Sequence, residues 1–188
     1  MTELPTAGLP ASSVVLITGI MAAGKSTVAQ ALAERLPRAV HIRGDGFRRM
    51  IVSGRVEMGD EDEREALAQL RLRHRLSAQA ADTCAQAGWT AVVQDIVIGP
   101  DLAAYAAMVR TRPFHVVVLA PSPATVQARE AARPKTGYGP GGWTPEVMDR
   151  ILREGTPRTG LWLETTGQSP AETVDTVLSR LGEARVAG

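Results

Sequence analysis

The sequence lacks the features that mark secreted, membrane and nucleic-acid-binding proteins. Its 188 residues include a single cysteine, Cys84, so no disulfide can form within the chain. No stretch approaches the ~20 apolar residues of a membrane-spanning helix, and the start has neither the basic residues nor the apolar run of a signal peptide. The 21 basic and 20 acidic residues leave no overall field to attract nucleic acid. These absences predict a cytoplasmic protein without a nucleic-acid or membrane partner.

The composition that remains is that of an ordinary globular domain. The chain is 44% hydrophobic and 22% charged, which is close to the average for soluble proteins. Residues 1–12 are rich in Pro, Ala, Ser and Thr and predict a flexible tail. Residues 13–188 are long enough for one domain with its own core. No internal repeat divides them, and nothing in them predicts an oligomeric state.

Short Val- and Ile-rich runs alternate with longer stretches of helical period, a pattern typical of an α/β protein with a parallel sheet. The runs lack strict polar alternation, as strands buried on both faces do. The predicted strands cover 13–19, 39–45, 90–98, 114–121 and 160–166. The predicted helices cover 25–36, about 60–87, and the neighbourhoods of 100–110, 122–133, 144–154 and 170–182. Asp60 and Glu63 have the spacing of a capping box for the second helix.

The most specific signal is the stretch GIMAAGKS, from Gly19 to Ser26, which matches GxxxxGK[ST] between a predicted strand and a predicted helix. Such a loop directs backbone N–H groups into one concavity, where they bind phosphate oxygens. Lys25 is expected to reach the β- and γ-phosphates and the Ser26 hydroxyl to bind Mg²⁺. The predicted nucleotide-binding residues of this P-loop are Gly19, Ile20, Met21, Ala22, Ala23, Gly24, Lys25, Ser26 and Thr27. No [NT]KxD guanine-reading sequence accompanies it, which disfavours a GTPase.

Two aspartates lie at or near the ends of predicted strands, at the edge where open α/β sheets bind ligands. Asp45 comes after the second strand, in HIRGDGFRRM, and is a candidate general base; Arg48, one turn further on, is a candidate acceptor-binding residue. The alternative for Asp45 is the cap of a helix that begins at Gly46. Asp95, in VVQDIVIG, is predicted to support Mg²⁺ or the acceptor rather than only to anchor a loop.

Arg129 and Arg133 are spaced i and i+4 on the predicted helix after the fourth strand, just before the Gly- and Pro-rich stretch RPKTGYGPGGW. Their alternative interpretation is a solvated helix face. The functional interpretation places one guanidinium over an adenine and the other on the phosphoryl group in transfer. The Gly-rich stretch then predicts a lid over the ligand, with an ordinary surface loop as the alternative.

As an ordered set, the P-loop, GDGFRR, the aspartate of the third strand, the arginine-bearing helix and LETTGQSPAETVDTVL resemble the small P-loop kinases that phosphorylate hydroxyls of small molecules. Within them the chain is similar to the chloramphenicol phosphotransferase family, and GDGFRR is also similar to adenylylsulfate kinase. The resemblance spans most of residues 13–182. The lid sequence departs from the pattern of this family, and the segment 51–65 has no feature that can be assigned to acceptor binding.

The resemblance implies a P-loop NTPase fold with a five-stranded parallel sheet of order 2-3-1-4-5, helices on both faces and a small lid. It also implies ATP with Mg²⁺ as donor, Asp45 as general base, Arg129 as the adenine-side arginine and Arg133 as the lid arginine. Thr166 and Gly167, in the ETTGQS stretch, are the implied backbone contacts of the adenine.

The sequence therefore predicts an ATP-dependent phosphotransferase whose acceptor is a hydroxyl of a small molecule, such as an antibiotic, a nucleoside or a sugar-like metabolite. A kinase of intermediary metabolism, including a nucleotide kinase, is the alternative among enzymes. A toxin that phosphorylates a cell-wall precursor is a further one. From a different class, a nucleotide-dependent regulatory or binding module would use the same P-loop.

Overall fold

The chain folds around a five-stranded parallel sheet, which a computed structural model describes for residues 11–132, 138 and 143–187. The strands are β1 (Val14–Thr18), β2 (Ala39–Arg43), β3 (Thr90–Gln94), β4 (Phe114–Leu119) and β5 (Leu161–Leu163). Their spatial order is β2-β3-β1-β4-β5, and every neighbouring pair is parallel. This confirms the predicted fold class and strand order.

The centre of the sheet forms the core. Every residue of β1, β3 and β4 is buried, whereas the edge strand β2 is only partly buried. Val and Ile suit these strands because their branched side chains pack well on a pleated surface. The central position of β1 places the loop that follows it in the middle of the carboxyl edge of the sheet.

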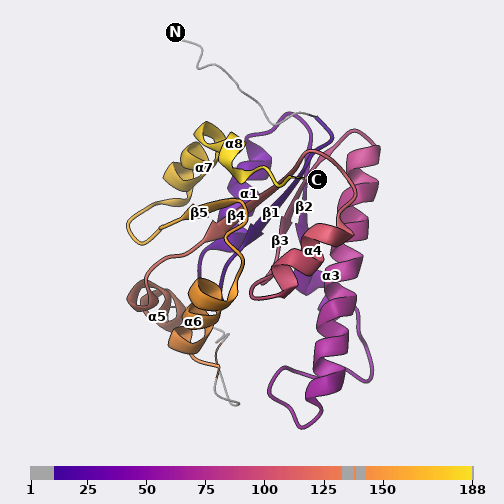
Figure 1. Ribbon diagram of the computed structural model, residues 1–188, viewed down its shortest axis with the longest axis vertical. Helices are drawn as coiled ribbons and strands as arrows, with labels where there is room; N and C mark the ends of the chain where they lie inside the picture. The colour runs from indigo at the N-terminus through magenta and orange to yellow at the C-terminus, as the bar shows by residue number, and fades with distance from the viewer. Residues whose placement is uncertain (1–10, 133–137, 139–142, 188) are drawn as a thin grey trace.

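Eight helices lie between or after the strands within the described residues. They are α1 (Lys25–Glu34), α2 (Gly44–Arg49), α3 (Glu63–Gln86), α4 (Asp101–Met108), α5 (Pro123–Ala131), α6 (Pro145–Gly155), α7 (Pro170–Ser179) and α8 (Leu181–Ala184). Figure 1 shows α3 and α4 on one side of the sheet and α1, α7 and α8 on the other. Three helices begin with proline after a Ser or Thr whose hydroxyl accepts a backbone N–H, which fixes where each one starts: α5, α6 and α7. Among the described helices, none combines the length and the apolar character needed to cross a membrane.

Several element ends differ from the sequence prediction. Strand β2 stops at Arg43, so Asp45 lies in the first turn of α2 rather than in a strand. Helix α3 begins at Glu63 after the cap Asp62, whose side chain accepts the N–H of Glu65 at 3.0 Å; the predicted capping box of Asp60 and Glu63 was wrong. Each of these segments contains several acidic residues or glycines at which a helix can begin, and the local sequence alone does not determine which of them is used.

Candidate active site

The P-loop joins β1 to α1 and has the backbone geometry that its glycines permit. Gly19 has φ 146° and Gly24 has φ 98°, and a Cβ at position 19 would overlap the carbonyl oxygen of Leu119 on β4. Gly24 is the N-cap of α1, so no side chain covers the first N–H groups of the helix, and its first turn carries no acidic residue. The N-terminus of α1 is therefore left open to an anion.

Lys25 and Ser26 lie where the motif predicts, in the first turn of α1. The Lys25 ammonium donates to the carbonyl oxygen of Ile20 across the loop at 2.6 Å. The Ser26 hydroxyl donates to Oε1 of Gln94, the last residue of β3, at 3.2 Å. The loop, its lysine and its hydroxyl are thus assembled around one concavity.

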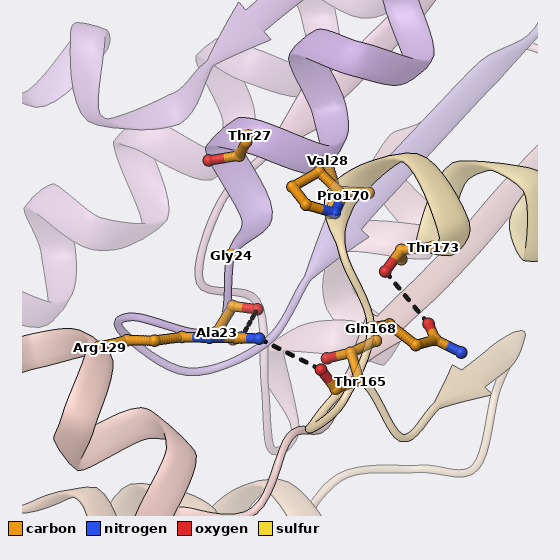
Figure 2. A pocket seen from close by; sticks show the side chains of 9 residues that line it. All are labelled: Ala23, Gly24, Thr27, Val28, Arg129, Thr165, Gln168, Pro170 and Thr173. Atoms are coloured by element: carbon orange, nitrogen blue, oxygen red, sulfur yellow. Dashed lines mark hydrogen bonds between the residues drawn. The ribbon is translucent and has the colours of Figure 1, made fainter.

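Two cavities open beside this loop and share Gly24, Thr27 and Arg129. The smaller one, of ≈ 200 Å³, is shown in Figure 2 and is lined by Ala23, Gly24, Thr27, Val28, Arg129, Thr165, Gln168, Pro170 and Thr173. The larger one, of ≈ 570 Å³, is lined by Met21, Ala22, Gly24, Lys25, Ser26, Thr27, Arg43, Asp45, Arg73, Gln94, Asp95, Ile96 and Arg129. Each of the predicted residues Lys25, Ser26, Asp45, Asp95 and Arg129 lines at least one of the two.

Arg129 extends from α5 to the wall of the smaller cavity. Its guanidinium donates to the carbonyl oxygens of Ala23 in the P-loop and Thr165 after β5, both at 3.2 Å. Figure 2 shows the side chain lying between these two backbone segments. For Arg129, the alternative of a solvated helix face is therefore wrong. Its planar cation borders the smaller cavity.

The loop after β5 reaches the smaller cavity with different residues from those predicted. Thr165 and Gln168 line it, whereas Thr166 and Gly167 are not among its lining residues. The Thr166 hydroxyl instead accepts the N–H of Ser122 at 2.8 Å and donates to Glu164, which holds the pKa of Glu164 below its usual value. The Thr165 hydroxyl is buried and makes no hydrogen bond in the part of the chain described here. It is a better placed candidate for a ligand contact than Thr166.

Asp45 lines the larger cavity. Its carboxylate is 3.2 Å from Nη2 of Arg49 and 3.8 Å from Nε of Arg43. Helix α2 begins at Gly44 with Arg43 as its N-cap, and no side chain caps it. The alternative that Asp45 only caps a helix starting at Gly46 is therefore wrong. The Asp45 side chain is 38% exposed, and its Oδ1 is buried without a hydrogen bond within the described residues.

Arg48 does not line this cavity. It forms an ion pair with Glu57 in the segment between α2 and α3, and it is absent from the lining of the larger cavity. The same segment is anchored by Gln69 of α3, whose amide donates to the carbonyl oxygen of Gly54 at 2.8 Å and accepts the N–H of Val56 at 3.1 Å. Arg43 and Arg73, rather than Arg48, are the arginines that face the larger cavity with Asp45.

Asp95 follows β3 and is held by a buried ion pair. Its side chain is fully buried, and Nε of Arg73 on α3 donates to its Oδ2 at 2.7 Å while Nη2 contacts Oδ1. The N–H of Ile96 also donates to Oδ1, at 2.7 Å. Burial lowers the pKa of Arg73 to about 10, so the guanidinium remains charged at neutral pH. The pair ties α3 to the end of β3.

Gly44 leaves the space that this carboxylate fills. A Cβ at position 44 would overlap the Asp95 carboxyl group, whereas a Cβ at Gly46 in the same helix meets no atom within 4 Å. We expect Gly44→Ala to lower the free energy of unfolding by about 1 to 3 kcal/mol through this overlap. Gly46→Ala is the matched control and is expected to raise it by about 0.5 to 1 kcal/mol, because alanine favours a helix. Urea denaturation of both variants measures the difference, and equal stabilities would contradict it.

Arg73 was missed in the sequence analysis, whereas Gln94 was expected to alternate with Asp95 to the other face of the sheet but was given no role. Gln94 alternates with Asp95 along β3 and therefore faces the P-loop instead of α3. Arg73 lies seven residues after Ala66 and four before Ser77, two buried residues of α3. A cation at such a position on the buried face of a helix is the signal that could have identified it.

The predicted lid is only partly described. Arg133 and most of the Gly-rich stretch lie outside the described residues, so the role of Arg133 stays a prediction. The described Tyr138 donates its hydroxyl to the carbonyl oxygen of Met21 in the P-loop at 2.9 Å. This contact brings one residue of the predicted lid to the edge of the larger cavity.

Comparisons with known proteins agree with the fold and the P-loop. The structure resembles APS kinase of Mycobacterium tuberculosis in complex with AMPPNP and APS, with a TM-score of 0.66 and 19% identity over 93% of this chain and 99% of that one. It resembles a sugar kinase of Janibacter sp. HTCC2649 with a TM-score of 0.64 and 18% identity, over 93% and 96%. It also resembles the tunicamycin resistance protein of Deinococcus radiodurans, with a TM-score of 0.62 and 16% identity over 94% of this chain and 99% of that one.

At these identities the structural likeness establishes the fold alone. A comparison with curated proteins gave no match. The family AAA_33, described as an AAA domain, matches residues 14–157, which contain the P-loop, Asp45, Arg73, Asp95 and Arg129. The match covers well over half of the chain, and the chain accordingly belongs to the AAA_33 family.

Proposed function

We propose that the protein is an ATP-dependent kinase that transfers the γ-phosphoryl group of ATP to a hydroxyl of a small molecule. One observation carries this proposal: the larger cavity, of ≈ 570 Å³, brings Lys25 and Ser26 of the P-loop into the same space as the carboxylate of Asp45. A phosphate-binding cation and a proton acceptor that share one cavity are what transfer to a hydroxyl requires.

The donor would occupy both cavities. The base would lie in the smaller one, against the Arg129 guanidinium and Pro170, and the phosphates would follow the P-loop to Lys25. Pro170 is the first residue of α7 and is fixed by the capping box of Ser169 and Glu172, so this wall is ordered before the base arrives. The Tyr138 hydroxyl, which donates to the carbonyl oxygen of Met21, would lie near the phosphates of the bound nucleotide.

The residues present fit a Mg²⁺ ion that arrives with the nucleotide. No group of three or more His, Cys, Asp or Glu in the described ranges could form a metal cage. Mg²⁺ is usually held through few protein oxygens together with substrate phosphates, and the Ser26 hydroxyl is such an oxygen. The ion, when bound, neutralises charge on the phosphates as transfer proceeds.

Asp45 would orient the acceptor hydroxyl and take its proton. As the acceptor oxygen forms its bond to the γ-phosphorus, the bond from that phosphorus to the β,γ-bridging oxygen breaks and ADP leaves. Lys25 stabilises the charge that develops on the phosphoryl oxygens, and the predicted role of Arg133 is the same. Arg43 and Arg73 border the acceptor side and would hold its polar groups.

The acceptor would be an antibiotic, a nucleoside or a sugar-like metabolite. The names of the similar structures, a sugar kinase, an APS kinase and a tunicamycin resistance protein, support a small hydroxyl-bearing molecule without choosing among these classes.

A panel of hydroxyl-bearing antibiotics, nucleosides and sugars, assayed with ATP and Mg²⁺, tests the function. We expect ADP release that depends on one class of acceptor, together with a mass gain of one phosphate on that acceptor. Lys25→Ala should abolish both signals. Acceptor-independent hydrolysis across the whole panel would instead support a nucleotide-dependent regulatory or binding module.

A further inference from the structure

The end of β3 presents two consecutive polar residues to opposite sides of the sheet. The Gln94 side chain points toward α1, where its Oε1 accepts the Ser26 hydroxyl at 3.2 Å. The Asp95 side chain points toward α3, where it pairs with Arg73. Alternation along a strand explains the opposite directions. The residue that contacts the Ser26 hydroxyl is therefore the neutral amide of Gln94 and not the carboxylate of Asp95.

Asp95 is not available for a second role at the P-loop. Its carboxylate is fully buried and engaged by the Arg73 guanidinium and by the N–H of Ile96. Gly44 packs against it so closely that no Cβ could fit between them. If Asp95 turned toward Ser26, it would leave the largely buried cation of Arg73 without its partner, which is unfavourable in a protein interior.

Gln94 is placed to hold the Ser26 hydroxyl in one orientation. It is 5% exposed and lies in the sheet between Ile17 of β1 and Arg43 of β2, so its backbone is fixed on both sides. In P-loop NTPases an aspartate at the end of a strand assists the P-loop Ser or Thr in holding Mg²⁺. The chain places an amide oxygen at the corresponding point of contact with Ser26.

We propose that Gln94, through its amide oxygen, is the residue that positions the Ser26 hydroxyl for Mg²⁺, and that Asp95 serves the ion pair with Arg73 instead. This inference rests on the proposed function only in assuming a Mg²⁺–nucleotide ligand. Because the amide is neutral, the protein adds little charge of its own at this point, and the metal enters mainly through the phosphates of the nucleotide.

Binding of AMPPNP, measured by calorimetry with Mg²⁺ and again with EDTA, tests the proposal. The quantity compared is the factor by which Mg²⁺ tightens binding. Gln94→Met keeps the length of the side chain without its oxygen, and we expect this factor to fall by about tenfold or more while metal-free binding stays within about twofold. Gln94→Glu supplies an acceptor oxygen again and is expected to retain or increase the factor. Asp95→Asn should leave it unchanged.

If Mg²⁺ tightened AMPPNP binding less in Asp95→Asn than in the wild type, the proposal would be overturned, because Asp95 would then serve the metal. This holds whatever the result for Gln94→Met. An unchanged factor in Gln94→Met would overturn it as well, and this comparison decides alone should Asp95→Asn fail to fold. No acceptor takes part in these measurements. Failure to phosphorylate any acceptor would therefore defeat the proposed function and leave the assignment of Gln94 standing.

Discussion

Asp45→Asn is expected to lower the rate of phosphoryl transfer by about 10²- to 10⁴-fold, the usual contribution of a general base. The amide has nearly the shape of the carboxylate but cannot accept the proton of the acceptor hydroxyl. Asp45 lines the same cavity as Lys25 and Ser26 but belongs to α2 and not to the P-loop. Affinity for AMPPNP should consequently remain near that of the wild type. Single-turnover kinetics and calorimetry measure the two quantities separately.

Asp175→Asn is the matched control for this variant. Asp175 is an exposed aspartate on α7 that also pairs with an arginine, Arg35 at 2.9 Å. It is outside the lining of both cavities. Transfer by this control should equal that of the wild type. If transfer survived Asp45→Asn to the same extent, the assignment of Asp45 as general base would be wrong.

Breaking the ion pair between Arg73 and Asp95 is expected to have the largest effect on stability. Asp95→Asn or Arg73→Met leaves one buried charge without its partner, which lowers the free energy of unfolding by about 3 to 5 kcal/mol. For a chain of this size, such a loss lowers Tm by about 6 to 20 °C. Both partners are largely removed from water, with side chains 14% and 0% exposed, so solvent does not screen the pair. Thermal unfolding followed by circular dichroism measures the change.

The exposed pair of Arg35 and Asp175 provides the control, because breaking it with Arg35→Met should change stability by less than about 1 kcal/mol. The double variant Arg73→Met with Asp95→Asn removes both charges. It should be more stable than the sum of the single effects implies, because neither charge is then left unpaired. If the double variant instead lost as much stability as the two single variants together, the two residues would contribute to stability independently.

The sequence was sufficient to predict the sheet and the P-loop because both depend on local patterns. Buried Val- and Ile-rich runs mark central strands, and the GxxxxGK[ST] motif specifies a backbone conformation within eight residues. The end of β2 was harder to predict. Its apolar residues end at Ile42, and the first residue of the helix that follows, Gly44, packs closely against Asp95, which is distant in the sequence.

The partners of the site residues depend on contacts across the sheet, which no local pattern records. Asp95 could be placed at the end of β3 from the sequence, but its pairing with Arg73 depends on how α3 rotates about its axis. The ETTGQS stretch was predicted to contact the adenine through Thr166 and Gly167, and the residues of it that line the smaller cavity are Thr165 and Gln168. Which of Thr165 and Thr166 faces that cavity is decided by the hydrogen bond between Thr166 and Ser122.

The two sides of the site come from separate parts of the chain. The P-loop, Arg129 and the loop after β5 lie on one side and are linked directly by the hydrogen bonds of Arg129. Arg43, Asp45 and Arg73 lie on the other and belong to one continuous stretch of sequence. Relatives could therefore exchange one type of acceptor for another by altering residues 43–73 alone. Under the proposed function, a chimaera that carries this stretch from a kinase of the family would be expected to use ATP as this protein does and to acquire the acceptor of that kinase.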